Sequence, residues 1–269
     1  MFRLLDIEFY KLRNSKYFWI LLILFMIFLI SVPISVNLFF ETIRSNKMTR
    51  EGRTLVNYVS FFYTEDLWHN LTYIYKLGTI LLAFITMISI TNEYNYKTIK
   101  QNIIDGLSKK EFLLSKIYMI IVLSLFVTFL VGIIGVVTGF LYSQTSDLSL
   151  IFENIKYLGF YFIYVLTFLL FSFFIANLIK KSGVSIAIMI FYIIMIEPII
   201  VAISTYGLKI EWLSSFYPIN GINNLISNPF SRHFFKDLNR FTLTPFFVSI
   251  FYIILYIYLT YKILKNRDL

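Results

Sequence analysis

Six long apolar stretches run through this chain of 269 residues and limit the folds open to it. They span residues 17–40, 71–91, 112–142, 157–179, 184–206 and 245–264. Each is about twenty residues or longer, which is the length an α-helix needs to cross a hydrocarbon core of about 30 Å. A helix on the surface of a soluble protein would show a polar face, and these stretches show none. The sequence therefore predicts an all-α integral membrane protein with six transmembrane helices.

The composition supports this class and removes several others. Hydrophobic residues make up 58% of the chain and charged residues only 14%, against about a quarter in soluble domains. The chain has no cysteine, so it can form neither disulfides nor thiolate metal sites. The first apolar stretch is longer than the core of a signal peptide and lacks a small-residue cleavage site, which indicates a retained span. An even number of spans places both termini on one side.

The basic residues indicate which side that is. Fourteen of the 24 lysine and arginine residues lie in four short segments: before the first span, after the second, after the fourth and after the sixth. Short cytoplasmic loops carry such an excess, so both termini and these loops are predicted to face the cytoplasm. The net charge of +9 is thus explained mainly by the orientation of the chain in the membrane. With no soluble domain to present a basic face, nucleic acid is not an expected partner.

Two segments outside the spans are predicted to be helical. Residues 1–16 carry apolar side chains at helical spacing among basic ones, which favours a helix lying in the membrane interface; a frayed terminus is the alternative. Residues 207–244, on the outer side, are apolar and aromatic but too short in each piece to cross a bilayer. Re-entrant or interfacial helices broken near Pro218 and Pro229 are expected there, because proline removes a backbone donor.

The charged segment 93–111, between the second and third spans, has its own helical pattern. Tyr96, Ile99 and Ile103 recur at spacings of three and four and are predicted to share one helix face. Gly106 then provides a stop, because glycine takes the left-handed conformation at a helix C-terminus without steric cost. The segment is thus predicted to be a short helix ending at residue 106.

The third span is predicted to begin directly after that stop. Ser108 and Glu111 have the spacing of a capping box, and Leu107 and Phe112 occupy the positions of a hydrophobic staple. A short helix joined to a span through such a corner could transmit force. The alternative is an interfacial helix that only anchors the bundle.

The same segment resembles a known family. The pattern E-x4-T-x-K-x2-I-x2-G-x-S-K-x-E-F-x3-K, from Glu93 to Lys116, is similar to the permeases of type-2 ABC exporters, nearest the bacterial bacitracin and lantibiotic-immunity group. The pattern E-x2-K-L-R at 8–13, the six-span layout and the proline-broken segment before the last span also look like that family. The resemblance covers the whole chain, but only the pattern from Glu93 to Lys116 is specific.

The resemblance implies partners and roles. The matching segment would be the coupling helix, which docks on a separate cytosolic ATP-binding subunit that binds ATP and magnesium. Two such subunits and two permeases, identical or different, would form the exporter in the lipid of a bacterial cytoplasmic membrane. Lys109 stands where arginine is common, which keeps the charge but loses bidentate bonding. The implied docking and coupling residues are Glu93, Thr98, Ile99, Lys100, Ile103, Ile104, Asp105, Gly106, Ser108, Lys109 and Glu111.

Enzymatic motifs are missing from the sequence. No G-x4-G-K-[ST] phosphate-binding loop occurs, so ATP hydrolysis would belong to the partner, and the chain needs no cofactor of its own. His69 and His233 fall in predicted outer loops without a metal-binding arrangement and are expected to be surface residues. The chain is therefore not expected to be an enzyme.

Two features inside the spans remain open. Glu197-Pro198 lies deep in the fifth span, where an ionisable group usually faces a cavity or a partner. Glu197, Pro198 and Pro218 are candidate pathway or gate residues, and a glutamate hydrogen-bonded within the bundle is the alternative. Gly132, Gly135 and Gly139 place small residues on one face of the third span, for packing within the chain or against a second permease.

The predicted function is that of an exporter permease that moves an amphipathic substrate, such as a lipid or a peptide. Two rivals are an ion-coupled secondary transporter and a membrane anchor for a soluble complex; the missing catalytic motifs count against a third, a membrane enzyme. The first should show several polar residues at the bilayer midplane, and only Glu197 suggests it. An activity assay would distinguish the membrane anchor from an exporter.

Overall fold

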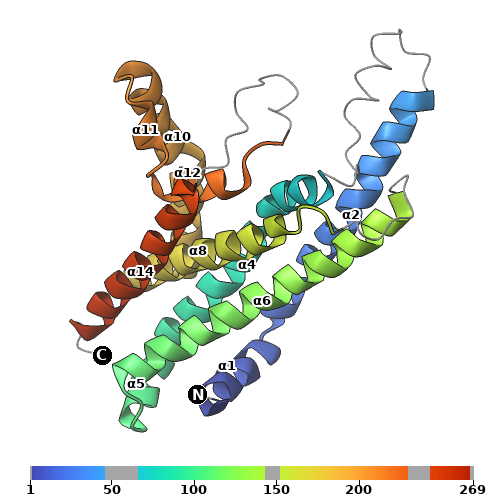
Figure 1. Cartoon of the computed structure of the whole chain (residues 1–269). Coiled ribbons are helices and arrows are strands. Elements are labelled where there is room, and N and C mark those ends of the chain that lie inside the picture. The colour runs from blue at the N-terminus through green and yellow to red at the C-terminus, as the bar shows by residue number, and fades with distance from the viewer. Residues whose placement is uncertain (1, 46–65, 143–151, 230–242, 267–269) are drawn as a thin grey trace.

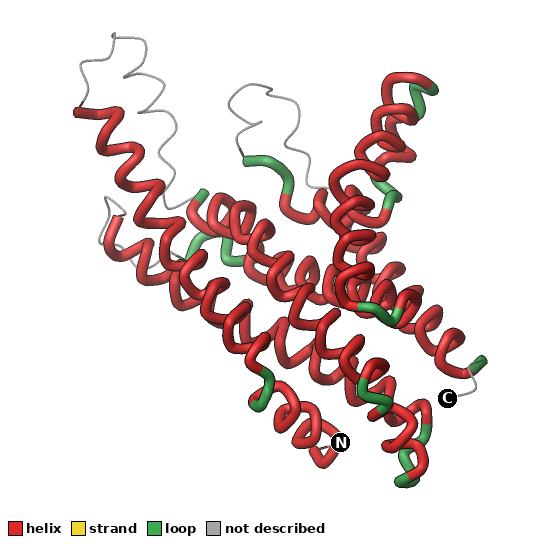
Figure 2. The backbone as a smooth tube through the Cα atoms, turned by 180° about the vertical axis from the view of Figure 1, so that it is seen from behind, coloured by secondary structure: helices red, strands yellow, loops and turns green. Residues whose placement is uncertain are grey.

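The computed structural model describes residues 2–45, 66–142, 152–229 and 243–266. Within these ranges every regular element is a helix, joined by short turns (Figure 2). The predicted all-α class is confirmed. Six of the helical segments are long and apolar enough to cross a membrane.

The six spans agree with the predicted ranges. Polar residues at several span ends continue the helical hydrogen bonding, so the helices run a few residues beyond the apolar stretches. The separate helix α1 covers Phe2–Arg13 and precedes the first span, as predicted. The spans are α2 (Lys16–Ser45), α4 (Leu67–Asn95), α6 (Lys109–Tyr142), α8 (Lys156–Ile179), the composite segment Ser182–Gly207 and α14 (Thr244–Lys265).

The fifth span is not a uniform α-helix. Two π-helical turns, η1 and η2, flank the short helix that starts at Glu197. The Glu197 amide donates to the Tyr192 carbonyl, five residues back, instead of the usual four. Pro198 has no amide hydrogen and its ring crowds the preceding turn, so the wider turn accommodates it. The pieces are α9 (Ser182–Phe191), η1 (Tyr192–Ile196), α10 (Glu197–Ala202) and η2 (Ile203–Gly207).

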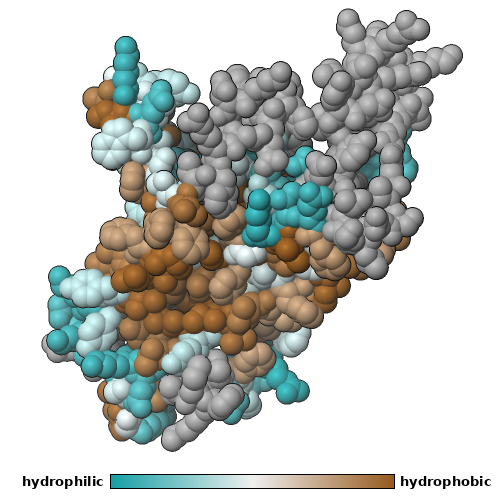
Figure 3. All heavy atoms as spheres, in the orientation of Figure 1, coloured by the Kyte–Doolittle hydropathy of each residue, from teal (hydrophilic) through white to brown (hydrophobic). Residues whose placement is uncertain are grey.

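Helix α8 lies at the centre of the bundle. It packs against α4, α6 and α14 and is the most deeply buried of the spans. Aromatic contacts join it to α14, where the Phe171 and Tyr256 ring centroids are 5.5 Å apart. The fifth span is mostly uncovered by the rest of the chain; Ile194, for example, is 71% exposed. Figure 3 shows apolar side chains gathered across the middle of the visible face, with hydrophilic ones toward its ends, as a bilayer requires.

Packing inside the chain explains one of the third-span glycines. A Cβ added to Gly135 would lie 2.5 Å from the Trp68 ring of α4, so only glycine allows this close approach. Trp68 is fully buried. The contact is intramolecular, which agrees with the packing interpretation at this position.

Both ends of the described chain lie at the same end of the bundle as α5 (Thr98–Ile104) (Figure 1). The Lys109 ammonium donates to the Lys265 carbonyl at 3.3 Å, which joins the start of α6 to the end of α14. The turn between α8 and α9 is at this end too, since the Lys180 ammonium lies 5.7 Å from the centre of the Tyr94 ring. We call this the basal end.

Short helices occupy the opposite end, which we call the distal end. They are α11 (Glu211–Ser214), α12 (Pro218–Asn223) and the 3₁₀ turn η3 (Asn224–Ile226). The predicted break near Pro218 lies between α11 and α12, and α12 begins at Pro218 because proline at the first helical position loses no hydrogen bond. Ile219 and Ile222 are buried, so α12 packs into the bundle.

Candidate functional site: a coupling corner and a buried charge cluster

The basal segment between α4 and α6 contains a short helix between two left-handed residues. After α4 ends at Asn95, Lys97 has φ 55° and α5 starts at the next residue. After α5, Gly106 has φ 97°. The Leu107 amide donates to the Asn102 carbonyl and the Gly106 amide to the Ile103 carbonyl, which together form a Schellman motif. The predicted glycine stop is therefore confirmed.

The capping box that starts α6 is also present. The Ser108 amide donates to Glu111 Oε2 at 2.8 Å, and the Glu111 amide donates to Ser108 Oγ at 3.2 Å. Leu107 is half-buried and Phe112 is buried, both in the apolar core. The corner has two consecutive backbone motifs with no free residue between them, so α5 and α6 are rigidly connected.

The faces of α5 differ from the prediction at one residue. Ile99 is buried and Ile103 is half-buried, but Tyr96 precedes the helix and is 77% exposed. The left-handed Lys97 breaks the helical register between Tyr96 and Ile99, so the three side chains share no face. The predicted common face is wrong for Tyr96 for this reason.

The remaining predicted docking residues divide by exposure. Lys100, Ile104 and Asp105 are exposed on α5 and at its end, and Ile104 reaches 83%. Thr98 is half-buried, and its hydroxyl lies 3.4 Å from the Glu93 carbonyl. The three exposed side chains form a small surface with one cation, one large aliphatic group and one anion. We call Lys100, Ile104 and Asp105 the α5 surface.

Glu93 belongs to a different arrangement, a cluster of four charges of which three are buried and Lys11 is partly exposed. Lys116 of α6 is fully buried and contacts both Glu8 of α1 and Glu93 of α4; its distance to Glu93 Oε1 is 2.5 Å. Lys11 of α1 lies 2.9 Å from the same Glu93 oxygen and 3.6 Å from Glu8. The two lysines balance the two glutamates. The charge cluster, Glu8, Lys11, Glu93 and Lys116, thus joins three helices.

No single sequence pattern predicted this cluster. Glu8 and Lys11 lie in one pattern and Glu93 and Lys116 in another, separated by the first two spans. The available signal was that each pattern contains two opposite charges beside a span, since charges near a membrane interior are usually paired. Which of these charged side chains pair with one another could be seen only in the packed structure.

The distal end contains a second polar arrangement, centred on Glu197. Its Oε1 accepts hydrogen bonds from the amides of Ile219 at 2.7 Å and Asn220 at 2.5 Å, at the start of α12. At the other end of the same segment, the Lys76 ammonium of α4 donates to the Ile226 carbonyl at 2.7 Å and the Asn223 carbonyl at 3.3 Å. An anion at the N-terminus and a cation at the C-terminus both favour the helix dipole.

These contacts make a clamp on the segment 218–226. Glu197 is 3% exposed and Lys76 is 9% exposed, so both side chains bind the segment's backbone groups inside the protein. Pro198 follows Glu197 and Pro218 begins the clamped segment, so the three candidate gate residues lie in and beside one contact. The clamp residues, Glu197 and Lys76, tie the fifth and second spans to α12.

His69 was predicted to be a surface residue, and the structure overturns this. Helix α4 begins at Leu67, so His69 lies in its first turn and not in a loop. It is fully buried, its Nε2 is 2.8 Å from the Ser227 carbonyl, and its ring stacks on Tyr157 at 4.2 Å. His233 falls outside the described residues.

Comparison with known proteins places the chain in a family. The family model described as ABC-2 family transporter protein matches residues 4–196, which is well over half of the chain. The chain belongs to the ABC-2 transporter family. It is therefore the membrane subunit of an ABC transporter, and family membership implies partnership with an ATP-binding subunit. A comparison with curated proteins found no match.

The match covers most of this ABC-2 permease's basal end. It includes α1, the α5 corner and the whole charge cluster. It ends at residue 196, one residue before Glu197, so half of the distal clamp lies beyond it. The bacitracin and lantibiotic-immunity subgroup suggested by the sequence is not distinguished by this match.

Proposed function

We propose that this ABC-2 permease exports an amphipathic substrate, a lipid or a peptide, using ATP hydrolysed by a cytosolic partner subunit. The observation that carries the proposal is the rigid α5 corner at the end of the bundle where both termini lie. Two copies of the partner, which would hold ATP and magnesium, and a second permease would complete the transporter. The apolar distal segments favour an amphipathic substrate over a small ion.

The orientation is part of the proposal. The basal end carries the excess of lysine and arginine in short segments, which supports a cytoplasmic position for both termini and α5 in a bacterial cytoplasmic membrane. The α5 surface would then face the cytosol, where a soluble ATP-binding subunit can reach it. Helix α1 flanks the same corner, because Glu8 and Lys11 line a groove with Gly106 and Leu107.

Force would pass from α5 to the spans along two routes. The Schellman motif and capping box connect α5 to α6 through the backbone. The charge cluster connects the base of α6 to α1 and α4. Closure of the ATP-binding subunits would tilt these helices together and shift the bundle between two states.

Replacing Gly106 by valine is expected to uncouple the transporter. A side chain at φ 97° is strained, and valine is the least tolerant because it is β-branched. No heavy atom lies within 4 Å of the added Cβ, so the effect would come from the backbone and not from a clash. We expect the ATPase rate of the assembled complex to fall at least tenfold.

The control for this substitution is Gly159→Val in α8. An added Cβ there also meets nothing within 4 Å, and Gly159 has no left-handed backbone. Full ATPase coupling in Gly106→Val would show that the corner does not transmit motion. Equal losses of ATPase rate in Gly106→Val and Gly159→Val would also show that the corner does not transmit motion.

Reversing charge on the α5 surface is expected to weaken assembly. Lys100→Glu changes an exposed residue, so the fold should be kept. Lys181→Glu makes the same change on an exposed basal residue outside α5. Co-purification of the ATP-binding subunit should drop several-fold for Lys100→Glu only. Adding Lys109→Glu should increase the loss, although Lys109 also bonds the end of α14. If Lys100→Glu and Lys181→Glu retain the partner equally, the docking surface lies elsewhere.

A further inference from the structure

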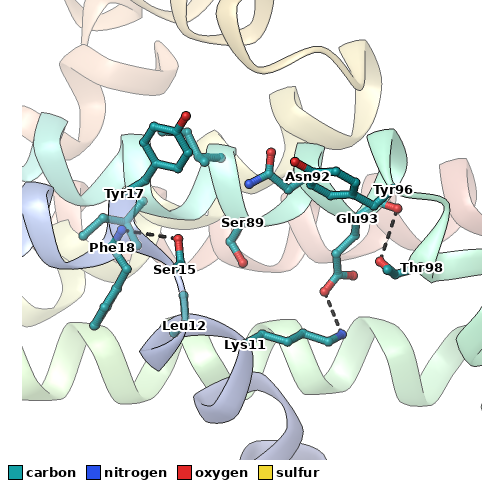
Figure 4. A pocket seen from close by; sticks show the side chains of 12 residues that line it. Lys11, Leu12, Ser15, Tyr17, Phe18, Ser89, Asn92, Glu93, Tyr96 and Thr98 are labelled. Carbon is teal, nitrogen blue, oxygen red and sulfur yellow. Dashed lines mark hydrogen bonds and ion pairs between the residues drawn. The ribbon is translucent and has the colours of Figure 1, made fainter.

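A cavity of about 190 Å³ lies at the basal end, beside the charge cluster (Figure 4). Its walls come from α1, the first turn of α2, the basal half of α4 and the start of α5. One water molecule needs only about 10–15 Å³ of such volume. The cavity therefore has room for a polar group of several atoms.

The lining combines polar and apolar side chains. Ser89, Asn92 and Glu93, which follow one another along one side of α4, supply polar atoms. Leu12 and Ile85 are among the apolar residues. A ligand with a polar head and an apolar tail matches such walls.

The cavity opens to the outside at two tyrosines. Tyr17 is 60% exposed and Tyr96 is 77% exposed, and both line the cavity. Each lies next to an exposed lysine in the sequence, Lys16 and Lys97. The opening is therefore aromatic, with an exposed lysine adjacent in sequence to each of its tyrosines, and it lies where α2 and α4 reach the end of the bundle. Aromatic and basic residues at that level are typical of the lipid headgroup region.

One buried oxygen of a residue that lines this cavity has no partner among the described residues. Glu93 Oε1 accepts from both Lys11 and Lys116, whereas Glu93 Oε2 accepts from no group that the structure describes. The Glu93 side chain is only 6% exposed. A buried acceptor without a partner is costly, and a carboxylate oxygen binds a charged donor most strongly. The free oxygen thus indicates a ligand that donates hydrogen bonds.

The charge balance defines the ligand further. The charge cluster is already neutral, because two lysines face two glutamates. A simple cation would leave an unbalanced positive charge beside a buried site. A zwitterion adds its donor without changing the net charge, and its anionic part can remain near the opening.

We propose that this cavity binds the headgroup of a zwitterionic membrane lipid with a primary ammonium, of the phosphatidylethanolamine class. The ammonium donates to Glu93 Oε2, with the Ser89 hydroxyl and the Asn92 amide oxygen beside it. The phosphate lies toward Lys16 and Lys97 at the opening, and the first acyl carbons cover Leu12 and Ile85. The bound lipid fills the space between α1 and α4 and braces the charge cluster.

Lipid binding by the full-length protein tests this proposal. In native mass spectrometry from detergent, phosphatidylethanolamine should bind at least about tenfold more tightly than phosphatidylcholine of the same chains. The two lipids share a phosphate and a positive charge, but the trimethylated nitrogen has no hydrogen to donate. Equal binding of the two lipids by the unmodified protein would overturn the proposal.

Two variants test whether the lipid binds in this cavity. Ser89→Leu fills the polar wall and leaves the charge cluster unchanged, so it should abolish the preference for phosphatidylethanolamine. Ser31→Leu makes the same change at an exposed position of α2 and should retain the preference. If Ser89→Leu keeps the preference, the lipid binds elsewhere and the proposal fails. Ser89→Val provides a smaller replacement if the leucine variant does not fold.

A soluble competitor tests whether the cavity binds a whole lipid or only the headgroup. Free phosphoethanolamine presents the same ammonium and phosphate but no chains for the apolar wall. It should not displace phosphatidylethanolamine at equal concentration. Displacement at equal concentration would show that the cavity takes a free metabolite and would overturn the assignment to a lipid.

Discussion

Replacing Lys116 by methionine is expected to destabilise the protein by about 3–5 kcal/mol, the usual cost of removing one partner from a buried ion pair. The fully buried Lys116 ammonium contacts Glu8 and Glu93, and methionine fills similar space without charge. Two buried carboxylates would then share only Lys11. The free energy of unfolding, measured by denaturant titration in mixed micelles, checks the loss.

The control for this effect is Lys110→Met. Lys110 is exposed on the same helix, so its replacement should change the unfolding free energy by no more than about 0.5 kcal/mol. A double variant, Lys116→Met with Glu8→Gln, should lose less than the sum of the single losses, because the second change removes one of the stranded charges. Strict additivity, or equal stability of Lys116→Met and Lys110→Met, would contradict a paired cluster.

The same cluster has a consequence for coupling. Three helices meet at four side chains, and two of these helices, α4 and α6, are themselves spans. If force moves α6 at the corner, the charge cluster is the contact through which α1 and α4 would move with it. A Lys116→Met variant that still folds in lipid should therefore show weaker ATPase coupling than Lys110→Met.

Glu197→Leu is expected to release α12 from the fifth span. The substitution leaves the amides of Ile219 and Asn220 without their acceptor, at about 1–3 kcal/mol for each buried amide. Because the chain contains no cysteine, a single Ile222→Cys substitution gives a specific probe. Ile222 is 1% exposed, so a maleimide reagent reaches it only when α12 detaches. We expect its labelling rate to rise at least about tenfold.

Two further variants test both ends of this clamp. Lys76→Met removes the cation at the C-terminal end of the clamped segment and should raise the labelling of Ile222→Cys in the same direction. Glu211→Leu removes an exposed carboxylate from α11 nearby and should leave the rate unchanged. Equal rates in Glu197→Leu and Glu211→Leu would show that the carboxylate does not hold α12.

The clamp also gives a structural meaning to the candidate gate residues. In the sequence, Glu197 could be either a pathway residue or a glutamate bonded within the bundle. Its hydrogen bonds to the α12 backbone agree with the second interpretation in this conformation. A role in gating would require that α12 moves when the fifth span moves.

Local features of this protein were readable from the sequence because their causes are local. The spans follow from uninterrupted apolar length, and the corner between α5 and α6 follows from a glycine and a serine–glutamate pair only a few residues apart. Such motifs form from neighbouring backbone groups whatever surrounds them. The prediction failed at Tyr96, where one left-handed residue, Lys97, changed the register.

Only the tertiary structure decided which distant charges meet. Glu8 and Lys116 are 108 residues apart, Glu197 and Ile219 join two different elements, and His69 became buried because α4 starts earlier than its apolar stretch. Hydrophobic periodicity states that a helix is buried but not which helix covers it. A charge in an apolar span needs a partner, and the rotation and packing of the helices select that partner. The sequence alone thus determined the spans and the corner, whereas packing determined the charge cluster, the clamp and the cavity between α1 and α4.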